Sequence, residues 1–351
     1  MSASIVTSAS TVGRASIVQI RAAVRRRRLF VVGGVVVALV AIAATALSLG
    51  AYAIAPADLW RTLWGGGSAR EAYVVFQVRM PRLLMGVLVG ACLGVAGALL
   101  QSLLGNPLAS PDLLGISGGS GAAAVFGLLI LGIGGPALAI VAFAGGIGVA
   151  AFLLLAGRRR ADGGYRLILA GVGVAFLCAA LTSYLMVRAK LELAQDALIW
   201  LTGSLASTPW WNVVTVAVVA LLAVPAIVAC ARWLPLTQLG APTAASLGVR
   251  AGTVRLAAIG TAVLLTAVTC AFAGPISFIA MCAPAIARPL LGHGAVAIGT
   301  SAAVGAVLLA AADLLAQYAL PGHAVPVGVV TGALGAVFLL WMLATSKGRQ
   351  L

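Results

Sequence analysis

The sequence is poor in charge, and above all in acidic residues. Charged residues make up 8% of the 351-residue chain, and only seven residues are acidic, whereas soluble domains average about 25% charged residues. Hydrophobic residues make up 62% of the chain. A soluble fold of this size could not bury so much apolar surface, because surface area keeps growing with mass. The composition therefore excludes a soluble globular protein and predicts a protein whose solvent is lipid.

Residue types that serve catalysis are equally scarce. The two histidines, His293 and His323, show neither metal-ligand nor catalytic-triad spacing. The two lysines, Lys190 and Lys347, are followed by Leu and Gly, so the phosphate-binding loop G-x-x-x-x-G-K-[ST] is absent. The five cysteines lie in or beside apolar runs without metal spacing. We therefore predict no catalytic residue, no metal and no cofactor in this chain, and no ATP hydrolysis by it.

The net charge of +15 does not indicate nucleic-acid binding. The basic residues are neither interleaved with aromatic residues nor gathered on one domain. They cluster between apolar runs, as the topology signals of membrane proteins do.

Ten apolar runs follow the N-terminal segment, and backbone polar groups cannot stay unpaired in lipid, so each run is predicted to be a helix. The runs are 29–55, 82–104, 113–133, 136–157, 167–187, 212–232, 256–273, 275–291, 295–320 and 325–346. A cleaved signal peptide is the alternative for the first run, but its 27 uncharged residues exceed the usual apolar region of about 7–15. The predicted fold class is an all-α polytopic membrane protein with ten transmembrane helices.

The basic residues also predict the orientation. Residues 1–28 end in "RRRR" and are expected to form a disordered or surface-lying cytoplasmic arm. Ten spans over 29–346 return the tail, 347–351, to the cytoplasm, and make 232–255 a cytoplasmic segment. Sixteen of the 22 Lys and Arg residues then lie inside. The remaining six lie outside and include two arginines in "RMPR" (79–82), which lipid anchoring alone could explain.

Two features inside the apolar runs predict helix contacts. Gly86, Gly90 and Gly94 recur every four residues, a small-residue face that lets helix backbones approach closely. Asp313 is the only acidic residue well inside an apolar run, and Gln317 follows one turn later. A membrane-buried charge needs a partner or a wet cavity, so we favour a structural polar contact over a proton relay.

Several motifs together resemble the FecCD family of permeases, the membrane subunits of ABC importers for ferric siderophores, haem and vitamin B12. The matching stretches are "RMPRLLMGVLVGACLGVAGALLQSLLGNPLASPDLLGISGGSG" (79–121), "LILAGVGVA" (167–175), "WLTGS" (200–204), "LGAPTAASLGV" (239–249), "GPISFIAMCAPAIAR" (274–288), "ADLLAQ" (312–317) and "PVGVVTGALGAVFLLWML" (326–343). The resemblance implies the ten-helix architecture of a type II ABC importer permease. It also implies a second permease copy or a sister permease, an ATPase dimer that binds ATP and Mg on the cytoplasmic side, and an extracytoplasmic substrate-binding protein.

The resemblance further implies roles for individual residues. Arg79 and Arg82 match arginines that face carboxylates of the binding protein, and Gln317 occupies a third docking position. Gly164, Tyr165 and Arg166 match the cytoplasmic gate. The predicted contacts to the ATPase lie in the coupling helix and are Leu239, Gly240, Pro242, Thr243, Ala244, Leu247 and Gly248.

Three positions depart from the family pattern. Ala285 replaces a histidine before Arg288, and Arg288 itself is predicted to be a buried polar residue, like Asp313. Gln317 replaces an arginine, which removes an expected salt-bridge partner of Asp313. Pro242 lies in the coupling segment, where only the first turn of a helix tolerates proline. These changes would be easier to carry beside a sister permease that keeps the usual residues, which favours a heterodimer.

We predict a permease subunit in the bacterial plasma (inner) membrane that forms half of the path for a ferric siderophore, with haem or vitamin B12 as alternative substrates. An ion-coupled secondary transporter would need buried titratable groups in several helices, and a membrane enzyme would need acids or histidines clustered at one depth. The sequence offers little of either beyond Asp313.

Overall fold

The structure is a computed structural model that describes residues 3–157, 163–292, 296–319 and 325–346. Every regular element within these ranges is a helix. Eight helical stretches are long and apolar enough to cross a membrane, and two shorter apolar helices accompany them in the described part of the chain. Together they correspond to the ten predicted runs, so the predicted all-α polytopic fold is confirmed.

The ten apolar helices have the following bounds: α1 Ala3–Ser48, α4 Met80–Leu104, α5 Ile116–Leu129, α6 Gly135–Gly157, α7 Gly163–Arg188, α9 Trp210–Thr237, α11 Ala251–Ala273, α12 Ile279–Leu291, α13 Ile298–Tyr318 and α14 Val327–Ser346. Short elements connect them: α2 Pro56–Leu63, α3 Ala69–Tyr73, the π-helical turn η1 Val74–Arg79, the 3₁₀ turn η2 Pro111–Leu114, α8 Leu191–Thr202 and α10 Ala241–Ser246. The prolines of α2, α4, η2 and α10 stand in the first turn, where a missing N–H costs no helical hydrogen bond.

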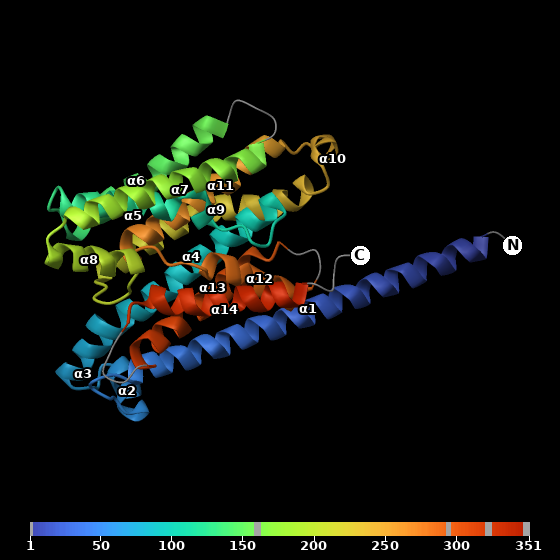
Figure 1. Ribbon diagram of the computed structural model, residues 1–351. Coiled ribbons are helices and arrows are strands. Elements are labelled where there is room, and N and C mark those ends of the chain that lie inside the picture. The colour runs from blue at the N-terminus through green and yellow to red at the C-terminus, as the bar shows by residue number, and fades with distance from the viewer. Residues whose placement is uncertain (1–2, 158–162, 293–295, 320–324, 347–351) are drawn as a thin grey trace.

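The basic N-terminal arm differs from the expectation of a disordered or surface-lying segment. It is helical from Ala3 and continuous with the first span, so that α1 reaches far past the bundle (Figure 1). No proline or turn residue separates the arginine cluster from the apolar run, and an uninterrupted helix satisfies every internal backbone group.

The two ends of the bundle carry different elements. The N-terminal end of α1 and the short helix α10 lie at one end, which we call the α10 end (Figure 1). Helices α2, α3 and α8 lie at the opposite end, which we call the α8 end. This arrangement agrees with a chain that crosses the membrane repeatedly.

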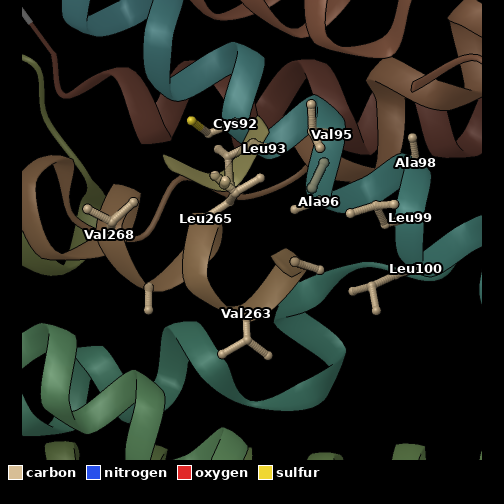
Figure 2. Close-up of a cluster of buried hydrophobic side chains, with 14 of the residues drawn as sticks. Cys92, Leu93, Val95, Ala96, Ala98, Leu99, Leu100, Val263, Leu265 and Val268 are labelled. Carbon is tan, nitrogen blue, oxygen red and sulfur yellow. The ribbon is translucent and has the colours of Figure 1, made fainter. Parts of the chain in front are cut away.

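Helices α4 and α11 form the centre of the molecule. In each, 72% of the most apolar window is buried within the chain, compared with 11% in α7 and 0% in α1. Side chains of α4, including Leu93 and Leu99, pack with those of α11, including Leu265 and Val268 (Figure 2). Because lipid is as apolar as these side chains, close packing rather than the hydrophobic effect holds such helices together.

The small-residue face of α4 lies against α13 and α12. A Cβ atom at Gly90 would overlap the carbonyl oxygen of Gly305, and one at Gly94 would overlap that of Ser301. A Cβ atom at Gly97 would overlap the carbonyl of Ala280 in α12. The predicted close approach is therefore confirmed, and it holds α13 and α12 directly against α4.

Candidate functional site

A charged cluster joins α4 and α13 at the α8 end. Arg82 follows Pro81 in the first turn of α4, and its guanidinium donates from Nε to Asp313 Oδ2 at 2.9 Å and from Nη2 to Asp313 Oδ1 at 2.8 Å. Gln317, one turn after Asp313 in α13, donates from Nε2 to Asp313 Oδ2 at 2.8 Å. The side chains of Arg82 and Asp313 are 22% and 8% exposed. The Asp313 carboxylate is thus paired and hydrogen-bonded, as a carboxylate in an apolar bundle must be.

This geometry corrects the inference that Asp313 loses its partner because position 317 is not an arginine. Arg82 supplies the positive charge from another helix, and Gln317 adds a neutral hydrogen bond. The predicted contact between Gln317 and Asp313 is present.

Arg79 is held differently. It is the last residue of the π-helical turn η1, and its guanidinium donates to the backbone carbonyl oxygens of Leu47 and Tyr52. Leu47 lies in the last turn of α1, whose final carbonyls have no partner within the helix. The Tyr318 hydroxyl donates to the carbonyl of Leu49 nearby, at 2.9 Å. Arg79 therefore links the end of α1 to the start of α4, and Tyr318 links it to α13.

A cavity of about 360 Å³ opens between these elements. Its polar lining includes Tyr52, Arg79, Arg82, Asp313 and Gln317. Both arginines line the cavity, yet both already donate within the chain. Neither is a free surface cation, and the Asp313 carboxylate weakens the attraction of Arg82 for a carboxylate from outside.

Three of the motif stretches also meet at the α8 end. The Ser204 N–H donates to the Ala273 carbonyl at 2.8 Å, and the Gly328 N–H donates to the Gly203 carbonyl at 3.1 Å. A Cβ atom at Gly274 would overlap the carbonyl of Trp200. The stretches 200–204, 274–288 and 326–343 thus share one backbone junction, which explains why each has glycine there.

The predicted coupling segment forms a compact knob at the α10 end. Gly240 and Gly248, both with positive φ, bracket the six-residue α10, and Pro242 stands in its first turn. The remaining predicted contacts divide by exposure. Leu239 and Leu247 are 61% and 53% exposed, and Thr243 is exposed as well, whereas Ala244 is fully buried.

A polar cavity of about 630 Å³ lies beside the end of α4, at the α10 end. Arg288 donates from Nη2 to the Ser102 hydroxyl at 3.1 Å, and Gln238 donates from Nε2 to the Ser102 carbonyl at 2.9 Å. Gln101, whose amide donates to the Met281 carbonyl at 3.1 Å, lines the same cavity. The sequence analysis singled out Arg288 but not Gln101, Ser102 or Gln238. The signal for Gln101 and Ser102 is the polar pair that they form inside the run 82–104.

The predicted gate residues Gly164, Tyr165 and Arg166 lie in the first turn of α7, and their side chains fall outside the described part of the chain. Among the described residues, no group of three or more His, Cys, Asp or Glu side chains could hold a metal ion.

Comparison with known proteins gives consistent matches over most of the chain. Residues 36–345 match the FecCD transport family. The chain is 37% identical over 304 residues to the ferric enterobactin transport system permease protein FepG of Escherichia coli (87% of this chain, 92% of that protein). It is 35% identical to the Fe(3+)-citrate import system permease protein YfmE of Bacillus subtilis (93% and 98%) and 34% identical to the vitamin B12 import system permease protein BtuC of Vibrio cholerae (82% and 87%).

Solved structures show the same architecture. A structure described as the inward-facing conformation of a metal-chelate type ABC transporter matches with a TM-score of 0.79 and 25% identity, over 90% of this chain and 99% of that one.

Proposed function

The chain belongs to the FecCD transport family, and we propose that it is the permease subunit of an ATP-driven importer of ferric siderophores, in which it forms half of the translocation path. It is a multi-pass protein of the bacterial inner (plasma) membrane. The observation that carries the proposal is the family match over residues 36–345, which coincides with the ten-helix bundle.

The substrate class rests on the relatives. FepG is named for ferric enterobactin and YfmE for Fe(3+)-citrate, so iron chelates predominate among these relatives. The name of BtuC keeps vitamin B12 as the alternative substrate. Haem, which is itself a large iron chelate, is the second alternative.

The energy for transport comes from a partner. We propose that the chain binds no cofactor, and that ATP and Mg are bound by an ATPase dimer on the side of the α10 end. Exposed Leu239, Leu247 and Thr243 support this assignment, because apolar and small side chains on a short rigid helix suit a knob that enters a cleft. Both termini of the chain then lie on the cytoplasmic side.

A binding protein docks at the opposite end in this proposal. Arg79 and Arg82 line the cavity there, and a carboxylate of the binding protein would bind Arg82 beside Asp313. The internal ion pair holds the arginine in place, and Asp313 uses two of its five N–H donors, so three remain for a second carboxylate.

The second half of the path is a sister permease in this proposal. YfmE and YfmD of Bacillus subtilis are both named as permease proteins of an Fe(3+)-citrate import system, and this chain is 35% and 32% identical to them. The departures at Gln317 and Pro242 are no longer an argument for a heterodimer, because the chain itself accommodates both residues.

Transport by the reconstituted importer tests the function. The chain, its ATPase, its sister permease and its binding protein are placed in proteoliposomes, and uptake of ⁵⁵Fe-siderophore, haem and cobalamin is compared. We expect siderophore uptake that requires ATP on the ATPase side and persists when the proton gradient is collapsed. Uptake driven by a proton gradient without ATP would favour an ion-coupled transporter. Uptake of only haem or only cobalamin would make that compound the substrate in place of a siderophore.

A further inference from the structure

An apolar groove runs along α1 where this helix packs on α12 and α13, near the α10 end. The groove has a volume of about 470 Å³, and α1 lines it with Phe30, Val31, Gly34, Val35 and Ala38. Aliphatic residues of α12 and α13 form the other wall. Since none of the apolar window of α1 is buried within the chain, the groove opens to whatever surrounds α1, and Figure 1 shows this helix at the edge of the bundle.

Arg27 stands at the end of this groove. It precedes the five lining residues of α1 by 3, 4, 7, 8 and 11 positions, which is the spacing of a single helix face. Its guanidinium donates from Nε to the Leu290 carbonyl at 2.8 Å and from Nη2 to the Pro289 carbonyl at 2.7 Å. A guanidinium has five N–H donors, so three remain available on a side chain whose position is already fixed.

Arg26 and Arg28 flank Arg27 and are exposed. The Arg26 guanidinium lies 5.6 Å from the ring centroid of Phe30, which lines the groove. No acidic residue occurs anywhere in α1 to neutralise these three charges. The end of the groove is therefore strongly cationic, whereas its walls are apolar.

The dimensions match one leaflet of a bilayer. The stretch from Arg27 to Ala38 covers about 16 Å of helix at about 1.5 Å per residue, and half of the hydrocarbon core measures about 15 Å. An arginine at one end and an apolar groove of this length therefore correspond to a phosphate at the headgroup level and an acyl chain below it.

We propose that this groove binds an anionic phospholipid, with the acyl chain along α1 and the phosphate on Arg27, Arg26 and Arg28. A basic pocket between helices beside a leaflet is a recognised mode of lipid-headgroup binding. The bound lipid would extend the contact of α1 with α12 and α13, to which Arg27 already links it. This site is independent of the transported substrate.

Lipid retention by the purified importer tests the proposal. The complex is exchanged in detergent into mixtures of phosphatidylglycerol and phosphatidylcholine with identical palmitoyl and oleoyl chains, and bound lipids are counted by native mass spectrometry. We expect phosphatidylglycerol to be retained selectively. The double variant Arg26→Gln/Arg28→Gln should lose that preference by about fivefold per arginine removed.

A matched pair of variants tests the groove itself. Gly34→Leu adds a side chain inside the groove, whereas Gly33→Leu adds the same side chain on the same helix outside it. A Cβ atom at either glycine has no atom within 4 Å, so neither change creates a clash. We expect Gly34→Leu to lose the bound phosphatidylglycerol and Gly33→Leu to keep it.

Three outcomes would overturn the proposal. Equal retention of the two lipids, or unchanged retention in Gly34→Leu, would show that the groove is not a specific lipid site. Binding of free glycerol 3-phosphate as strong as that of the lipid would reduce it to an anion site without an acyl chain. Disulfide cross-linking of two copies through Ala38→Cys would make the groove a protein interface instead.

Discussion

Arg82 illustrates how an internal ion pair can weaken an arginine for a second partner. Its bidentate pair with Asp313 satisfies a carboxylate that is only 8% exposed. The same guanidinium lines a cavity at the end of the bundle where a binding protein is proposed to dock. If docking uses Arg82, the internal pair opposes it, because Asp313 neutralises the arginine and repels a second carboxylate beside it.

This repulsion predicts that Asp313→Asn strengthens docking. Loss of the internal carboxylate frees the Arg82 charge, while Gln317 and the new amide preserve the local packing. We expect the affinity for the binding protein to rise about fivefold, equivalent to about 1 kcal/mol, with the larger effect on the association rate at low salt. Surface plasmon resonance on the complex in nanodiscs measures this change.

Asp58→Asn is the control for this prediction. It removes the ion pair with Arg61 on the exposed surface of α2, at the same end of the bundle. In this pair Arg61 Nη1 lies 3.7 Å from Asp58 Oδ1. The net charge changes equally, but no cavity arginine is released. Equal effects of the two variants would show that only the change in net charge matters. No effect of Asp313→Asn would show that the binding protein does not use Arg82.

At the scale of single elements, α10 presents a surface different from the one its sequence suggested. All seven residues of the segment were candidates for ATPase contact, but Ala244 is fully buried, and its amide donates to the Gly240 carbonyl at 3.0 Å. A large substitution there would disturb the knob itself. The exposed Leu239 and Leu247 are the residues that can enter a partner's cleft.

Leu247→Asp is therefore the sharper test of coupling. The change places a charge on an exposed position of the knob, so the chain should fold and insert normally. We expect the ATPase to lose most of its transport-linked stimulation, because burying an unpaired carboxylate in an apolar contact is strongly unfavourable. Stimulated ATP hydrolysis in proteoliposomes is the measurement.

Leu191→Asp provides the matched control, since Leu191 is also exposed but begins α8 at the opposite end. It should leave ATP hydrolysis unchanged. If Leu247→Asp behaves like this control, the ATPase does not bind α10.

The boundaries of the apolar helices followed from hydropathy because lipid imposes length and apolarity on each span. The run 82–104 became α4, Met80–Leu104. The predicted run 113–133 begins too early, because a 3₁₀ turn and the left-handed Gly115 precede α5, which begins at Ile116. Helix α8 was not predicted, since Glu192 and Asp196 conceal its apolar residues in a window average.

At the scale of the whole molecule, contacts between distant segments limited what the sequence could predict. Asp313 stood out as an isolated acid, and its link to Gln317 followed from helical spacing. Its ion pair with Arg82 spans 231 positions and depends on the glycine face that brings α4 and α13 together. Such a pair cannot be inferred from either segment alone, because it requires the packing of both.

The distribution of burial raises the question of what completes the molecule. Helices α4 and α11 are central, but α1, α7, α9 and α14 leave most of their apolar surface exposed. Lipid can cover much of this surface, and in the proposed importer a second permease covers the part that borders the transport path. The two Bacillus subtilis relatives named for the same Fe(3+)-citrate substrate favour a sister chain for that position.

A heterodimer predicts that the chain is incomplete alone. Co-expressed with its ATPase only, it should yield no complex that transports siderophore, because two identical permeases would not reproduce the complementary faces of a matched pair. Addition of a sister permease should restore a complex with one copy of each permease and ATP-dependent uptake. Native mass spectrometry measures the stoichiometry, and ⁵⁵Fe uptake measures the activity. A stable homodimer that transports siderophore would contradict the prediction and would assign both halves of the path to this chain.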